Sequence, residues 1–197
     1  NQDLIETGKD GFAKFVYLDD ASIIKIHKNS ELYIRGKAEK NVINKRLNIS
    51  NGVIKLDVSK QKEDEFTVVT PTSVASVKGT SFILETNIDS GDKFYGFEGT
   101  VEILNKESNQ IINLSRNLKV ISSPDGQINS EIITQSDLDI INQMQSSSGE
   151  TQIPQDFDEM QEGDEQAEEE DDSLKQIKII VKSSTGEEKE IIINYSE

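Results

Sequence analysis

The chain has 197 residues, enough to bury one good core with a small appendage. Its formal net charge is −16, but residues 150–172 hold twelve acidic side chains and no basic one, so removing those twelve leaves only −4. Nucleic-acid binding is excluded, because phosphates are bound through clustered Lys and Arg. The absence of cysteine excludes disulfides, thiolate metal sites and a thiol nucleophile.

Membrane insertion and export leave different traces in a sequence. No run approaches the roughly 18 apolar residues of a membrane helix, so we expect no membrane span. The chain begins at Asn1 rather than at Met, and we take this as an indication that a leader has been removed. We therefore expect a location outside the cytoplasm.

Residues 11–121 consist of short runs with a period of two, broken by Gly, Asp, Asn or Ser. In VIKLDV, Ile54, Leu56 and Val58 share one face, and in SFILE, Phe82 and Leu84 alternate with Ser81, Ile83 and Glu85. We count about twelve such strands. The pattern predicts an all-β domain over residues 1–128, built as a two-sheet sandwich or a short β-coil.

One helix is expected in residues 129–146. Ser136 is the expected N-cap, with Asp139 three residues later, and Leu138, Ile141 and Met144 recur at helical spacing. The pattern predicts three turns that cap the domain, with this apolar stripe facing inward across an open end of the sheets.

Residues 147–173 are mainly Ser, Gln, Glu and Asp, and such a composition predicts an acidic, flexible linker. Residues 174–197 then predict an amphipathic β-hairpin that turns at residues 183–186. An isolated hairpin is marginal in water, so its apolar face must be covered by the chain's own domain or by a neighbouring chain. The expected docking face comprises Ile177, Ile179, Val181, Ile191, Ile193 and Tyr195.

Residues 78–81, Lys-Gly-Thr-Ser, raise the question of a phosphate loop or a nucleophile. A phosphate loop needs two glycines before Lys-Ser/Thr and a helix after them, whereas here one glycine follows Lys78 and a strand follows Gly79. A serine nucleophile needs a base, and the one histidine, His27, is expected to be a surface imidazole at a strand end. Gly79 is better interpreted as a bulge or close approach between strands.

Carboxylates are abundant, but none forms a convincing catalytic pair. Asp19 and Asp20 are expected to be solvated neighbours in a hairpin loop, where their side chains bond nearby backbone amides. The best calcium-loop frame begins at Asp158, but its third position is Met160, which has no oxygen to donate. We therefore expect no catalytic residue, no cofactor and no dedicated metal site.

Four segments together resemble the FecR family of bacterial envelope domains. They are GFAKFVYLDDASIIKIHKNSEL, LNISNGVIKLDV, FTVVTPTSVASVKGTSFILE and GFEGTVEIL, and the resemblance covers residues 8–122. The family pattern has an Asp-Gly-Ser-like turn, a Thr-Pro and Val-x-Gly-Thr-x-Phe segment, and a Glu-Gly-x-Val segment. The matching positions are Thr70, Pro71, Val77, Gly79, Thr80, Phe82, Glu98, Gly99 and Val101.

This resemblance implies an all-β domain outside the cytoplasm. In the family's founding members such a domain belongs to a sensor that relays the state of an outer-membrane receptor to a sigma factor. The present chain departs from that pattern, since it has Ala21 in the first turn and neither an anti-sigma segment nor a membrane helix. Sigma-factor signalling is therefore not carried over.

We expect a noncatalytic, exported binding or scaffold module of the bacterial envelope, with a protein partner or a second copy. Gly79, Thr80, Phe82 and Gly99 are expected to be structural, at strand boundaries or inward positions. The alternative is a self-assembling subunit of a surface fibre or layer, joined through the C-terminal hairpin. A hydrolase acting on envelope polysaccharide is a third hypothesis, because β folds host glycosidases.

Overall fold

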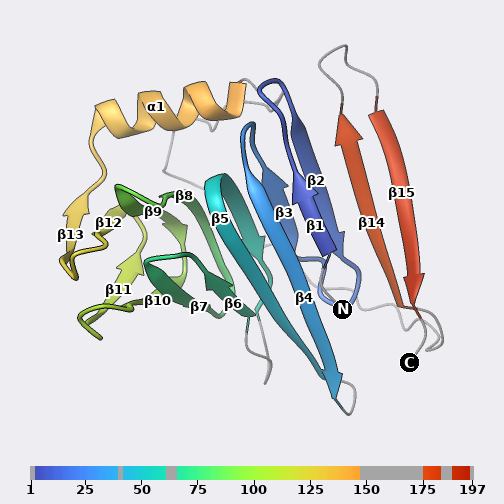
Figure 1. Cartoon of the computed structure of the whole chain (residues 1–197), viewed down its shortest axis with the longest axis horizontal. Helices are drawn as coiled ribbons and strands as arrows, with labels where there is room; N and C mark the ends of the chain where they lie inside the picture. The colour runs from blue at the N-terminus through green and yellow to red at the C-terminus, as the bar shows by residue number, and fades with distance from the viewer. Residues whose placement is uncertain (1–2, 40–41, 61–65, 147–174, 183–187, 196–197) are drawn as a thin grey trace, which may run out of the picture.

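The computed structural model describes residues 3–39, 42–60, 66–146, 175–182 and 188–195, with side chains described within 3–36, 44–60 and 66–143. Within these ranges thirteen strands precede one helix, and two strands follow it. The expected all-β architecture with a single C-terminal helix is confirmed (Figure 1).

Two sheets share the long strand β5 (Val42–Val58). Sheet A runs in the order β1, β4, β5, β6, β7, β10, β11, and sheet B in the order β13, β12, β9, β8, β5, β3, β2, β14, β15. All strand pairs are antiparallel except β5 with β6. The other bounds in sheet A are β1 (Asp3–Glu6), β4 (Glu31–Glu39), β6 (Phe66–Val69), β7 (Ser73–Val77), β10 (Thr100–Asn105) and β11 (Ile111–Ser115). Those in sheet B are β2 (Phe12–Tyr17), β3 (Ile23–Ile26), β8 (Thr80–Asn87), β9 (Gly91–Glu98), β12 (Leu118–Ser122), β13 (Ile128–Ile132), β14 (Lys175–Lys182) and β15 (Glu188–Tyr195).

The core lies between the two sheets and follows the period-two pattern of the strands. Because alternate side chains of a strand point to opposite faces, each half-buried strand contributes every second residue. Sheet B contributes Phe82 and Phe94, whose ring centroids lie 6.5 Å apart, and sheet A contributes Leu47 and Phe66. One continuous apolar cluster therefore holds both sheets together.

The chain crosses between the sheets at residues with positive φ. Gly79 (φ 77°) joins β7 of sheet A to β8 of sheet B, Gly99 (φ 70°) returns the chain to β10, and Asn117 (φ 64°) leads on to β12. Gly52 (φ 116°) lies within β5, where its pairing passes from sheet A to sheet B. Such left-handed conformations suit Gly and Asn, so each crossing has a sequence that permits it.

The helix α1 (Gln135–Ser146) has the expected length, but its N-cap is Thr134 and not Ser136. The Thr134 hydroxyl accepts a hydrogen bond from the Asp137 amide at 3.3 Å, while the Asp137 carboxylate accepts one from the Thr134 amide at 2.9 Å. This reciprocal pair is a capping box with Asp at its fourth position. It begins the helix two residues earlier than the Ser136 prediction requires.

The helix packs on the outer face of sheet B, not across an open end of the sheets. Ile141 is buried against Ile83 and Tyr95, with Leu138 and Phe97 beside them. The reason is that β8 and β9 carry apolar side chains on both faces, and the outward ones require cover.

The C-terminal strands β14 and β15 form a hairpin at the edge of sheet B, where β14 pairs with β2 of the same chain. The register places Ile177, Ile179 and Val181 opposite Tyr17, Phe15 and Ala13, which are core residues. The side chains of the hairpin lie outside the described ones, so its docking face stays a prediction.

Candidate functional site

The family-like positions of the third and fourth segments meet at one corner of the two sheets. A Cβ atom added to Gly99 would lie 2.4 Å from the Gly79 carbonyl oxygen and 2.7 Å from Thr80 Cγ2. Nearby, Val101 stands opposite Val77 in the sheet A ladder, and Phe82 lies in the core. A Cβ at Gly79 would lie 2.9 Å from Lys60 Cα. The corner is thus a close crossing of backbones.

Thr70 and Pro71 lie at the opposite end of β7, in the turn that joins it to β6. The Thr70 hydroxyl accepts hydrogen bonds from the amides of Thr72, at 3.1 Å, and Ser73, at 2.7 Å. It also donates one to Asp92 of sheet B at 2.6 Å. Thr70 therefore fixes a tight turn in one sheet and ties it to a carboxylate in the other.

Asp92 is the most buried carboxylate of this end of the fold, with 1% of its surface exposed. The Thr86 hydroxyl donates a second hydrogen bond to it at 2.5 Å. Burial raises the pKa of Asp92, an effect that hydrogen bonds from Ser73, Thr70 and Thr86 and the charge of Lys106 oppose. The local sequence pattern does not mark Asp92, because two of its partners, Thr70 and Ser73, belong to the other sheet.

A buried polar chain continues from this carboxylate into the end of sheets A and B. Ser73 donates a hydrogen bond to Ser122 at 2.9 Å, and the Asn105 amide donates to Ser122 and to the Ser123 carbonyl, each at 2.9 Å. Lys106 Nζ donates to the Thr70 carbonyl. The arrangement satisfies buried polar groups with one another, so it is built for structure.

Asp19 and Asp20 lie in the β2–β3 turn, as expected, and Asp20 accepts a hydrogen bond from the Ser22 amide at 2.9 Å. The expectation that both are solvated holds for Asp19, which is exposed, but not for Asp20, which is half-buried. Their carboxylates contact Lys45 Nζ at 2.7 Å and 2.5 Å, and Lys45 is 1% exposed, with its ammonium 4.8 Å from the Tyr17 ring centroid. The pair neutralises a buried cation, which leaves it unsuited to acid/base chemistry.

Lys45 could have been found from the period-two pattern. It shares the inward phase of β5 with Leu47 and Ile49, both of them core residues. A lysine at an inward position requires a buried anion, and the two aspartates of the β2–β3 turn supply it.

His27 is buried and not a surface imidazole, with 3% of its surface exposed. Its ring lies edge-on to Phe12, with the centroids 5.9 Å apart. The alternation of β3 ends here, because the backbone amide of His27 bonds to the Val53 carbonyl at 3.0 Å and draws the residue against β5. Its burial and its contact with Phe12 place the ring in the packing of the fold.

Two further properties of the described residues concern metal binding and membrane insertion. These residues hold no group of three or more His, Asp or Glu side chains close enough to share a metal ion. The calcium-loop frame that begins at Asp158 lies outside them. In the described part of the chain, no helix is both long and apolar enough to cross a bilayer.

An open cleft of about 670 Å³ lies between the β10–β11 turn and the β12–β13 turn. Asn105 preorganises both turns, since its side-chain oxygen accepts hydrogen bonds from the Glu107 and Ser108 amides while its NH2 group bonds the second turn. The cleft could hydrogen-bond a small polar molecule. Its lining comprises Glu107, Ser108, Gln110, Asp125, Gly126, Gln127, Ile128 and Asn129.

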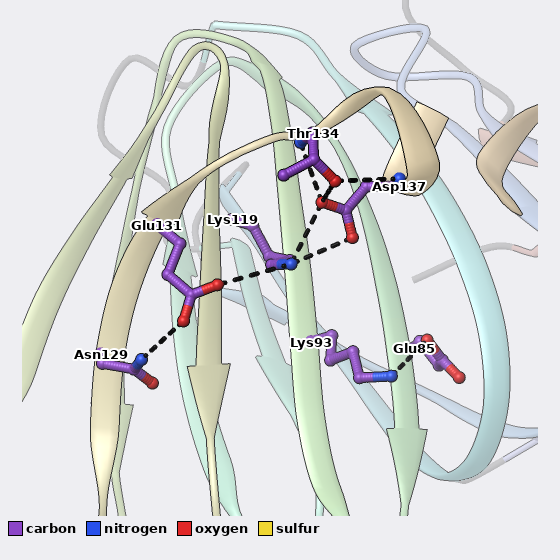
Figure 2. Close-up of polar contacts among 7 residues, drawn as sticks. All are labelled: Glu85, Lys93, Lys119, Asn129, Glu131, Thr134 and Asp137. Carbon is purple, nitrogen blue, oxygen red and sulfur yellow. Dashed lines mark hydrogen bonds and ion pairs between the residues drawn. The ribbon is translucent and has the colours of Figure 1, made fainter. Parts of the chain in front are cut away.

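The start of α1 is fastened to sheet B by a network of charges, which Figure 2 shows. Lys119 of β12 contacts both oxygens of Asp137, at 3.0 Å and 3.1 Å, and Glu131 of β13 at 3.6 Å. Burial raises the pKa of Asp137, but the hydrogen bonds from Thr134 and Lys119 outweigh it and lower the pKa overall. The network therefore stabilises the ionised carboxylate.

Solved structures show where this fold occurs. Two crystal structures of a candidate anti-sigma factor from Parabacteroides distasonis ATCC 8503 are similar, with TM-scores of 0.61 and 0.60 and 16% sequence identity each. The matches cover 74% and 73% of this chain and 65% of the solved one, so the chain spans less than two thirds of the length of that protein. At this identity the likeness defines the fold class alone. No curated protein matches the sequence.

The sequence itself supplies the family. The profile of the FecR family, described as FecR protein, matches residues 3–102, which is more than half of the chain. The chain belongs to the FecR family, and the resemblance seen in the four sequence segments is confirmed.

Proposed function

We propose that this chain is a noncatalytic binding or scaffold module of the bacterial cell envelope, located outside the cytoplasm. The observation that carries the proposal is the FecR family match over residues 3–102. The similar Parabacteroides structures, which belong to a candidate anti-sigma factor, add support for a partner that is itself a protein.

The use of polar side chains supports a role without catalysis. Asp19 and Asp20 neutralise Lys45, and Thr70 and Asp92 join the two sheets. A catalytic carboxylate pair needs two groups in contrasting environments beside an open cleft. These described carboxylates instead make structural contacts with Lys45 and Thr70. The same argument disfavours the hydrolase hypothesis.

Cell fractionation tests the proposed location. Antibody against the chain should find it in the periplasmic, outer-membrane or surface fraction of the source bacterium, and cross-linking in intact cells should join it to a protein partner. Recovery with a cytoplasmic marker, with no cross-linked product, would contradict the proposal.

A self-assembling structural subunit is the second candidate, and the β14–β15 hairpin favours it. This hairpin covers the edge strand β2 through backbone pairing, an interaction that the hairpin of a neighbouring chain could supply equally well. Light scattering at several concentrations distinguishes the candidates. A mass that grows with concentration, and falls to one chain when residues 174–197 are deleted, would establish assembly, whereas a constant single-chain mass would exclude it.

A further inference from the structure

Three lysines stand side by side on the outer face of sheet B. Lys14 of β2 is directly opposite Lys25 of β3, and Lys25 is directly opposite Lys55 of β5. Each is half-exposed, and its two neighbours along the strand are buried in the core, so all three point outward. We call Lys14, Lys25 and Lys55 the lysine row.

The lysine row is costly unless an anion covers it. Like charges directly opposite one another on a sheet destabilise the pairing of their strands. Neither Lys14 nor Lys55 makes an ion pair with any residue whose side chain the structure describes. Lys14 and Lys55, the two ends of the row, therefore have the chemistry of a docking surface for a flexible polyanion.

The path of the chain brings such a polyanion to this face. The helix α1 packs on the outer face of sheet B, over Ile83 of β8 and Tyr95 of β9. The next described element is β14, on the far side of β5, β3 and β2 in the same sheet. Between β8, which lies under the middle of α1, and β14, sheet B consists of β5, β3 and β2, and these three strands carry the lysine row.

Residues 147–174 make that connection, and within them residues 150–172 carry twelve acidic side chains and no basic one. We propose that the lysine row is the docking site for this acidic run of the same chain. Coulomb attraction is weak for one exposed pair but adds up when several charges face a row of opposite sign. The inference goes beyond the proposed function and does not depend on it.

Zero-length carbodiimide coupling of the full-length chain tests the proposal, with the products mapped by mass spectrometry. We expect amide cross-links between carboxylates of residues 150–172 and Lys14, Lys25 and Lys55, and we expect high salt to abolish them. Lys78 is more exposed but lies at the β7–β8 crossing, so it serves as the internal reference. Coupling in proportion to exposure, with Lys78 ahead of the row, would overturn the proposal.

A pair of variants with equal charge gives a second readout. One variant changes Lys14, Lys25 and Lys55 to Gln. The other changes Lys9, Lys28 and Lys78, three exposed lysines between strands, to Gln. Cleavage by a glutamate-specific protease within residues 150–172 should be about threefold faster or more in the first variant only, because cleavage follows the undocked population. Equal rates would refute the docking. Cross-links that join isotope-labelled to unlabelled copies would refute it too, since the occupant would then be a second chain.

Discussion

Gly79 and Gly99 share one corner, and their backbone geometry leaves no room for a side chain. We predict that Gly79→Val and Gly99→Ala each lower the free energy of unfolding by at least about 1–2 kcal/mol, because a left-handed conformation alone costs an L-residue that much. Chemical denaturation followed by circular dichroism measures the change. Gly8→Ala is the control, since no atom lies within 4 Å of its added Cβ. An unchanged free energy of unfolding in both corner variants would show that the crossing tolerates a side chain.

Thr70 is expected to be worth more than its size suggests, because it serves two elements. We predict that Thr70→Val lowers the free energy of unfolding by about 2 kcal/mol. The variant loses the hydrogen bond that Thr70 donates to a buried carboxylate and the two that its hydroxyl accepts from amides of the turn. Thr67→Val, on the half-exposed face of β6, keeps the shape of the change without these bonds. Equal unfolding midpoints for the two variants would show that the Thr70 hydrogen bonds do not stabilise the fold.

The alternation of residues predicted the inward side chains well, because a half-buried strand reports its core face directly in its sequence. It failed where a side chain's surroundings come from elsewhere in the chain. Ile83 gave the helix an outer face to cover, and Lys45 met two aspartates from another strand pair. His27 was misjudged because the strand ends at it and the turn closes over it. Such contacts depend on topology, which local periodicity does not encode.

At the scale of elements, α1 depends on the ionised Asp137. Because its pKa is lowered in the folded chain, the stabilisation is present above the ordinary value of 3.8 and is lost as the pH falls through the lowered pKa. We predict that Asp137→Asn removes about 1 kcal/mol near neutral pH, from the lost cap and the lost Lys119 contact. Hydrogen exchange of the α1 amides should show the loss.

The same variant should differ less from the unmodified chain as the pH falls below 3.8, since both then lack the carboxylate charge. Asp139→Asn is the matched control, because Asp139 is exposed and accepts a hydrogen bond from the Gln135 side chain at 3.2 Å. A pH-independent difference between Asp137→Asn and the unmodified chain would contradict an ionic role for this cap.

At the scale of the whole molecule, the C-terminal hairpin is part of sheet B. Substitutions on the inward and outward faces of this hairpin can be compared. We predict that changing Ile179 and Ile193 together to Lys releases the hairpin, because these positions share the face opposite the core residues of β2. Amides of β14 and β2 should then exchange rapidly.

Ile180→Gln with Ile192→Gln makes outward register positions polar without placing a lysine opposite Lys14 or Lys178, and it should leave this exchange slow. If both variants stayed protected, the docking face predicted from the sequence would be abandoned. If both exchanged rapidly to a similar extent, strand pairing, and not burial, would be what holds the hairpin.

The regular crossing between sheets has a consequence for how the fold can grow. Each hairpin after β5 lies in the sheet opposite to the hairpin before it, and pairs with the hairpin two places earlier: β10 with β7, and β12 with β9. The family match ends at residue 102, yet this alternation continues unchanged to β13. Length is therefore a free variable of the architecture, because a further hairpin can be added after β13 while the earlier strands keep all their partners.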